Sequence, residues 1–106
     1  MKMALAALCL VAGLARASET SDLYDKKCSV CHGDDGRGKT RMGKRFHAPD
    51  FASAKWQANA KDAELRKVIE NGVVEDGVHR MPAWKGKLTP AQIDGLVQLV
   101  RGFGKH

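Results

Sequence analysis

The stretch Cys28-Ser29-Val30-Cys31-His32 carries the most information in this chain of 106 residues. Residues three and four positions apart share one face of a helical turn, so Cys28, Cys31 and His32 should point to the same side. Ser29 and Val30 should point elsewhere. One face of the chain would therefore present two thiols and one imidazole.

This spacing is the attachment pattern of c-type haem. Two thiols on one face can add to the two vinyl groups of a single porphyrin, and the imidazole of the next residue can coordinate the iron. The sequence therefore predicts one haem c, covalently attached through two thioether bonds to Cys28 and Cys31. His32 is the predicted proximal ligand of the iron.

Three other interpretations of the two cysteines remain: a thioredoxin-type redox pair, half of a zinc site, and a plain disulfide. A zinc site needs about four ligands, and the one further cysteine, Cys9, lies in an N-terminal segment with the features of an export signal. A thioredoxin-type pair needs neighbouring strands, whereas Leu23 to Cys28 favours a helix and Gly33 to Gly38 a loop. Haem attachment is the preferred interpretation.

In the N-terminal segment, Lys2 is followed by an apolar run from Met3 to Leu14, and Ala15-Arg16-Ala17 fits a small-residue cleavage site. The run is too short to span a bilayer. We therefore expect residues 1–17 to be a signal peptide that is cleaved after Ala17. Residues 18–106 would then form a single periplasmic domain without a membrane span. An uncleaved N-terminal helix is the alternative.

Three helices are predicted after this segment. Ser21 is a candidate N-cap for the first, which leads into the cysteine motif. The second opens at Asp62 and ends at Asn71-Gly72. Thr89 begins the last as N-cap, followed by a proline at the first helical position and a glutamine that completes a capping box. Apolar residues then recur at helical spacing: Ile93, Leu96, Val97 and Val100.

Between the first two helices, Lys39 to Ala60 shows neither a helical period nor alternation. We predict an irregular loop around the cofactor, with Phe46, Phe51 and Trp56 turned inward. A domain of this size has a small core and needs a further stabilising group, which the haem would supply. The haem-free chain should therefore be poorly ordered.

The second axial position of the iron has five candidate ligands: Met42, His47, His79, Met81 and the C-terminal His106. Met81 is preferred, because Pro82 restricts the preceding residue to extended geometry that can present a side chain inward. A thioether also favours ferrous iron and raises the potential relative to a second imidazole. His79 is the main rival, and a core-filling role is the alternative for Met81.

Taken together, these motifs resemble class I c-type cytochromes, specifically the small bacterial single-haem proteins. The resemblance covers essentially all of residues 18–106. It rests on the cysteine motif followed by Gly33, on Arg80-Met81-Pro82-Ala83-Trp84, and on Leu88-Thr89 at the start of the last helix. One departure is Leu99, where the family often has an aromatic residue.

The resemblance implies an all-α cytochrome c fold, with about three main helices and long loops wrapped around one covalently bound haem. By position, Cys28 and Cys31 would be the thioether links, and His32 and Met81 the axial ligands. In that family a proline carbonyl accepts a hydrogen bond from the other ring N–H of the proximal histidine. Pro49 is the candidate for this role in the present chain.

Two strong axial ligands leave no open coordination site, so we expect an electron carrier that transfers one electron by an outer-sphere route, and not an enzyme. A haem-based sensor, a gas-binding module or a peroxidase-type module is the alternative, and each requires a labile distal ligand.

The formal net charge of +6 suggests how redox partners are met. Basic residues cluster between positions 37 and 45, and this cluster could steer acidic partner proteins to the haem edge. A solvated loop is the equally weighted alternative. We expect no nucleic-acid binding and a monomer. The cluster consists of Arg37, Lys39, Arg41, Lys44 and Arg45.

Overall fold

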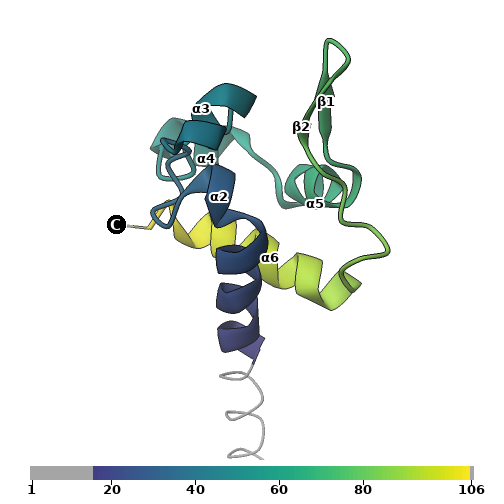
Figure 1. The fold of residues 1–106 in the computed structure, drawn as a ribbon. Coiled ribbons are helices and arrows are strands. Elements are labelled where there is room, and N and C mark those ends of the chain that lie inside the picture. Colours follow the sequence, from purple (N-terminus) through teal and green to yellow (C-terminus); the bar gives the residue numbers. More distant parts are fainter. Residues whose placement is uncertain (1–15, 106) are drawn as a thin grey trace, which may run out of the picture.

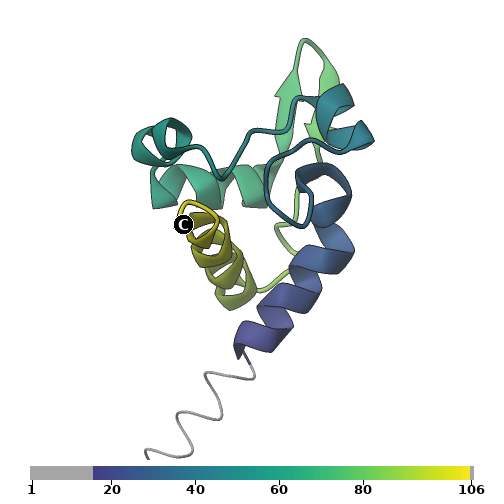
Figure 2. The same ribbon diagram turned by 90° about the vertical axis from the view of Figure 1, so that its left-hand side faces the viewer.

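The computed structural model describes residues 16–105 of the chain. These residues are mostly helical, in agreement with the predicted all-α class, and they include one small two-stranded sheet (Figures 1 and 2). Residues 16–27 form the first helix. In chain order there follow α2 (Ser29–His32), α3 (Arg41–Phe46), α4 (Ala54–Asn59), α5 (Asp62–Asn71), β1 (Val73–Glu75), β2 (Val78–Met81) and α6 (Pro90–Gly102).

The first helix crosses α6 at close range (Figure 1). A Cβ atom at Gly95 would lie 2.6 Å from the Thr20 hydroxyl oxygen, so a side chain at this position would require Thr20 to move. The close crossing offsets the helix propensity that a glycine loses, about 1 kcal/mol. Nearer the cysteine motif, the rings of Tyr24 and Phe103 pack with their centroids 5.3 Å apart.

Both of the longer predicted helices form as expected. The Thr89 hydroxyl accepts a hydrogen bond from the Gln92 backbone N–H, and the Gln92 side chain accepts one from the Thr89 N–H, which confirms the capping box. Helix α5 starts at Asp62 and ends at Asn71, as predicted. Together with α5, α6 supplies most of the core, and its buried residues are the predicted ones: Ile93, Leu96, Val97 and Val100.

The prediction of an irregular loop from Lys39 to Ala60 is wrong, because this stretch contains α3 and α4. Each has six residues and is capped by a hydroxyl: Thr40 accepts from the N–H of Gly43, and Ser53 accepts from that of Trp56. Helices this short do not contain enough turns to show an apolar period. Their caps were the available signal.

The hairpin of β1 and β2 was not predicted. Asp76 and Gly77 join the strands with positive φ values of 52° and 77°, and Asp-Gly is a favoured pair for such a two-residue turn. The short strands show little alternation because most of their residues are exposed. The hairpin projects beyond α5, at the upper right of Figure 1.

The prediction of Ser21 as an N-cap is also wrong. Residues 16–27 are continuously helical, so Ser21 lies inside the helix and not at its start. The neighbouring Thr20 is accommodated there by a hydrogen bond from its hydroxyl to the Arg16 carbonyl, one turn earlier. Residues 1–15 lie outside the described residues, so the predicted signal peptide remains a prediction. Among residues 16–105, no helix combines the length and the apolar character needed to cross a membrane.

Candidate functional site

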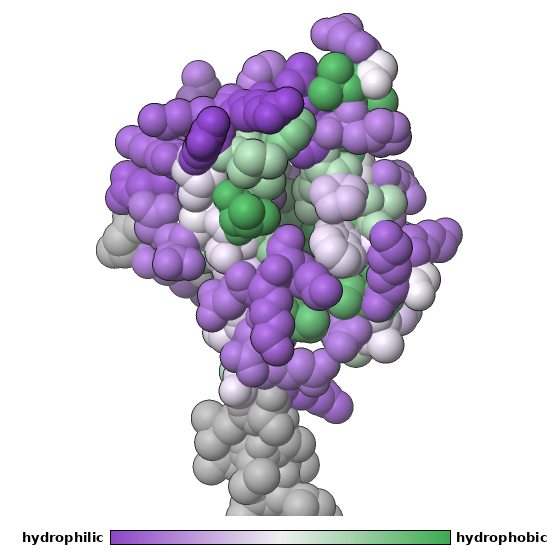
Figure 3. Space-filling view, in the orientation of Figure 1, coloured by the Kyte–Doolittle hydropathy of each residue, from purple (hydrophilic) through white to green (hydrophobic). Residues whose placement is uncertain are grey.

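A cavity of about 420 Å³ lies between the cysteine motif, α5, α6 and the hairpin. Its volume falls within the range of about 300–1,000 Å³ that is usual for ligand and cofactor sites. Figure 3 shows a hollow near the centre of the surface, with green and white side chains on both sides of it. Most of the walls are apolar, with Phe51, Leu65, Ile69, Leu96 and Val100 among the lining residues.

All four predicted site residues line this cavity: Cys28, Cys31 and His32 on one element, and Met81 at the end of β2. The cavity thus has two thiols and an imidazole from one part of the fold and a thioether from a strand far along the chain. Met81 ends a strand instead of lying in a loop, and this agrees with the extended geometry expected before Pro82.

The rival candidates for the distal position are placed differently. His47 also lines the cavity, as an exposed residue at the C-cap of α3. Met42 and His79 are not among the lining residues. His106 lies outside the described residues.

The His32 imidazole is held by an aromatic neighbour. It stacks on the Phe51 ring, with centroids 4.6 Å apart and an angle of 19° between the planes. Gln57 fixes this support, because its side-chain amide donates to the carbonyls of both Phe51 and Val100, at 2.8 and 3.0 Å. The ring orientation of His32 is therefore set by α4 and α6 as well as by the motif itself.

Burial lowers the pKa of His32 to about 4, because desolvation disfavours the charged imidazolium. The imidazole is thus neutral at neutral pH, and neutral imidazole is the form that coordinates metals. Its Nδ1 atom is buried without a hydrogen-bond partner. The Pro49 carbonyl, the expected acceptor, therefore forms no hydrogen bond with this nitrogen. Pro49 does line the cavity, but its carbonyl packs against Gly38.

The two thiols are protonated at neutral pH. Burial, and to a lesser degree the neighbouring Cys31, raises the pKa of Cys28 to about 11, and burial also raises the pKa of Cys31. Neither residue is in a disulfide. Redox-active Cys-x-x-Cys pairs have lowered thiol pKa values, so this environment does not favour a thioredoxin-type site. Within residues 16–105, no group of three or more His, Cys, Asp or Glu side chains is arranged to hold a metal ion.

Two hydrogen bonds anchor the motif to the rest of the fold. The phenol of Tyr24, whose pKa is raised mainly by burial, donates to the Gly33 carbonyl at 2.6 Å. The Thr40 hydroxyl donates to the Cys31 carbonyl at 2.7 Å and accepts from the N–H of Gly43 at 2.9 Å. The first helix and α3 therefore both hold the C-terminal end of the motif.

Met81 is positioned by the start of the hairpin. Gly72 has a φ of 73° and packs directly against the Met81 carbonyl, and Val73 pairs with Met81 in the sheet. After the strand, the backbone N–H of Trp84 donates to the Ile69 carbonyl of α5 at 3.0 Å. The chain around Met81 is thereby fixed to α5 on both sides.

These residues fit a haem. An apolar cavity of suitable size is lined by two thiols and by an imidazole that burial keeps neutral. The thioether enters from a separate element, as a second axial ligand requires.

The comparisons with known proteins agree with this site. Residues 15–100 match the family described as cytochrome c oxidase, cbb3-type, subunit III. The chain belongs to this family. It is 39% identical over 93 residues to the cbb3-type cytochrome c oxidase subunit FixPc of Rhizobium leguminosarum bv. viciae, a match that covers 87% of this chain and 29% of the relative. Identity to subunit CcoP of Azospirillum brasilense is 33%, covering 85% and 29% respectively. The chain thus spans less than a third of the length of these relatives.

A solved structure, the KustC0563 c-type cytochrome, superposes on this cytochrome with a TM-score of 0.72 and 40% sequence identity. The superposition covers 80% of the present chain and 96% of the other. The predicted class I c-type cytochrome fold is therefore confirmed. A cytochrome c domain binds haem c.

Sequence reasoning gave no site role to three further charged residues that line the cavity of this cytochrome: Lys27, Glu75 and Arg80. Two of them lie on the hairpin. Recognising the Asp-Gly turn would have placed Glu75 and Arg80 on neighbouring strands, close to Met81.

Proposed function

We propose that this cytochrome domain carries single electrons outside the cytoplasm, with one haem c bound through thioether bonds to Cys28 and Cys31 and ligated by His32 and Met81. The observation that supports this proposal is that these four side chains line one apolar cavity. Bound there, the haem supplies a ferric/ferrous couple.

The surrounding residues would hold the two iron ligands, His32 and Met81, in fixed positions. Phe51 and Gln57 hold the His32 ring, and α5 holds the strand that bears Met81. Ligands that do not move when the oxidation state changes keep the reorganisation energy small, and a small reorganisation energy suits outer-sphere electron transfer. The apolar walls would limit the access of water to a haem bound there.

A labile distal ligand would instead suit a sensor, a gas-binding module or a peroxidase. The observation that favours this second candidate is His47, an exposed polar residue on the cavity wall. Protein expressed with a haem-attachment system separates the two. Covalently bound, six-coordinate low-spin haem with a methionine-to-iron charge-transfer band supports the carrier. High-spin ferric haem supports the alternative, and protein without covalent haem contradicts both.

Met81→Ala is expected to abolish the methionine-to-iron band and to lower the reduction potential, because a thioether stabilises ferrous iron. Met42→Ala is the matched control, since Met42 does not line the cavity. Visible spectra and potentiometric titration measure both. An unchanged spectrum in Met81→Ala would assign the distal position to another residue.

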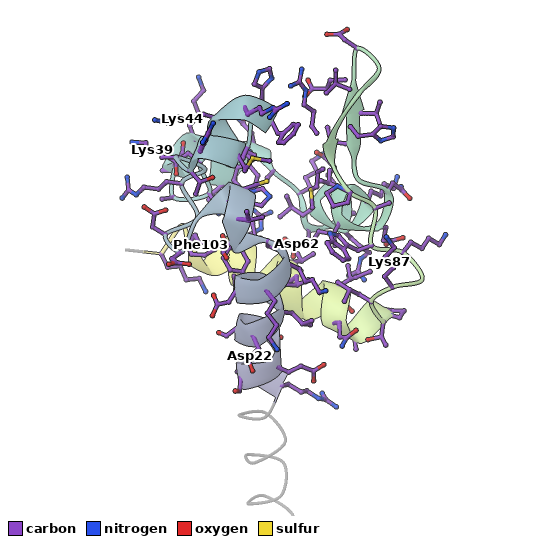
Figure 4. The ribbon with its side chains drawn as sticks, viewed as in Figure 1. Asp22, Lys39, Lys44, Asp62, Lys87 and Phe103 are labelled. Carbon is purple, nitrogen blue, oxygen red and sulfur yellow. The ribbon has the colours of Figure 1, made fainter. Side chains whose placement is uncertain are left out.

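The names of the relatives make other subunits of a cbb3-type oxidase the candidate partners. Those relatives are subunits of an enzyme complex, and the part proposed for this domain is electron transfer to or from such a complex. The basic cluster of positions 37–45 is exposed, on α3 and the loop before it. Figure 4 shows Lys39 and Lys44 on the α3 side of the molecule and Lys87 on the opposite side.

Electron exchange with an acidic redox protein is expected to slow about tenfold from low to high ionic strength, because salt screens the attraction that steers the encounter. Stopped-flow rates with Lys39→Gln/Lys44→Gln should show a weaker dependence. Exchange with an uncharged small-molecule oxidant, the control, should not depend on salt. A flat profile with the acidic partner would remove the steering role of this cluster.

A further inference from the structure

Arg80 enters the cavity next to Met81, although successive residues of a strand normally face opposite sides of a sheet. The register explains the exception. Val73 pairs with Met81 and Val74 pairs with His79, so Arg80 is an extra residue on β2 without a partner on β1. Such a bulge redirects a side chain, and here it brings Arg80 and Met81 to the same cavity.

The guanidinium of Arg80 is only partly satisfied by the protein. One Nη donates to the Arg45 carbonyl at 3.2 Å, while Nε is buried without a partner. Within residues 16–105, the ion pairs are Arg37 with Asp35, Arg66 with Asp94, and Arg101 with Asp62, so none of them involves Arg80.

Few other charged groups face this part of the cavity. Glu75, on the neighbouring strand, lines the cavity but is exposed and makes no ion pair with Arg80. Lys27 and the exposed His47 line it from other elements. A buried guanidinium N–H that lacks an acceptor is costly, so the site calls for an anion from the ligand.

We propose that Arg80 binds a carboxylate of the cofactor, one of the two haem propionates. This inference rests on the proposed function, because the carboxylate belongs to the haem placed there. Arginine suits the role, since its planar guanidinium can donate two parallel hydrogen bonds to a carboxylate and stays charged at any physiological pH. Arg80 is a positioning residue: it orients the cofactor and neutralises a negative charge that would otherwise stabilise ferric iron.

Arg80→Gln is expected to leave both thioether bonds and the low-spin spectrum intact while lowering the reduction potential. Loss of one nearby positive charge should favour the ferric form about tenfold, a shift of about 59 mV for one electron. Arg80→Lys keeps the charge and should restore most of the shift. Spectroelectrochemistry measures the potentials, and the mass of the intact protein reports haem attachment.

Arg45→Gln is the matched control. Arg45 is exposed and contacts Arg80 through its backbone carbonyl, so its side chain supplies charge nearby without the same contact. An equal shift in Arg45→Gln and Arg80→Gln would overturn the proposal in favour of a general charge effect. Normal haem content with an unchanged potential in Arg80→Gln would overturn it and leave the proposed function standing. Absence of covalent haem in the unsubstituted protein would instead refute the proposed function.

A measurement on the unsubstituted holoprotein tests the contact without any variant. Proton NMR of the ferrous form should show a nuclear Overhauser effect between the Arg80 Nε–H and a propionate methylene, and slow exchange of that N–H with solvent. Rapid exchange and no such effect would contradict the proposal even if the variants do not accumulate.

Discussion

The double variant Cys28→Ala/Cys31→Ala is expected to lose its cooperative thermal unfolding transition, because without thioether bonds the cavity is no longer filled by a fixed haem. An empty apolar cavity costs about 24 cal/mol per Å³, so the cavity of about 420 Å³ corresponds to about 10 kcal/mol. This figure is an upper limit, because the cavity is open at the surface and admits water. It is nevertheless comparable with the whole stability of a typical domain, about 5–15 kcal/mol.

Circular dichroism during heating measures the effect. Val30→Ala is the matched control: Val30 lies between the two cysteines, its side chain is exposed, and both thiols remain. The control should attach haem and melt cooperatively. Full helicity and a sharp transition in the double variant would show that the polypeptide is stable alone and that haem does not complete its core.

The second large effect is expected at Gly43, which is buried in α3 beneath the cysteine motif. A Cβ atom here would collide with the backbone carbonyls of Cys31 and Gly38, which cannot move as a flexible side chain could. Gly43→Ala should therefore push α3 away and break the hydrogen bond from Thr40 to the Cys31 carbonyl. Overpacking of this kind costs about 2 kcal/mol.

In a domain of this size that loss corresponds to a fall in Tm of about 10 °C. Thermal melts of the holoprotein measure it. Gly102→Ala is the matched control, because a Cβ at this last position of α6 meets nothing within 4 Å. The control should melt at or slightly above the original temperature, since alanine favours a helix. Equal melting of the two variants would mean that α3 can shift at no cost.

Local interactions explain what could be predicted. The Thr89 capping box and the apolar spacing from Ile93 to Val100 involve residues within two turns of one another, so the sequence was enough to place α6. The same holds for α5 up to Gly72. Helices α3 and α4 escaped prediction because each has only six residues, and their sole local signals were the hydroxyl caps Thr40 and Ser53.

The candidate site divides in a similar way. Cys28, Cys31 and His32 share a face because of their spacing within one turn, and they line one cavity with Met81, as the resemblance implied. The acceptor for the His32 ring could not be predicted, and Pro49 does not fill that role. Phe51 was expected to turn inward, but its stacking on His32 depends on Gln57 and on α6.

By itself the sequence determined the helical class, the cysteine and histidine face, and the bounds of α5 and α6, because each depends on neighbours within a few residues. Only the tertiary structure decided that Gly95 and Gly43 are points of close approach, and that a bulge turns Arg80 into the cavity beside Met81. These features depend on strand register and on contacts between segments far apart in the chain. Such contacts are set by how the whole chain packs around one cavity, and no local pattern encodes them.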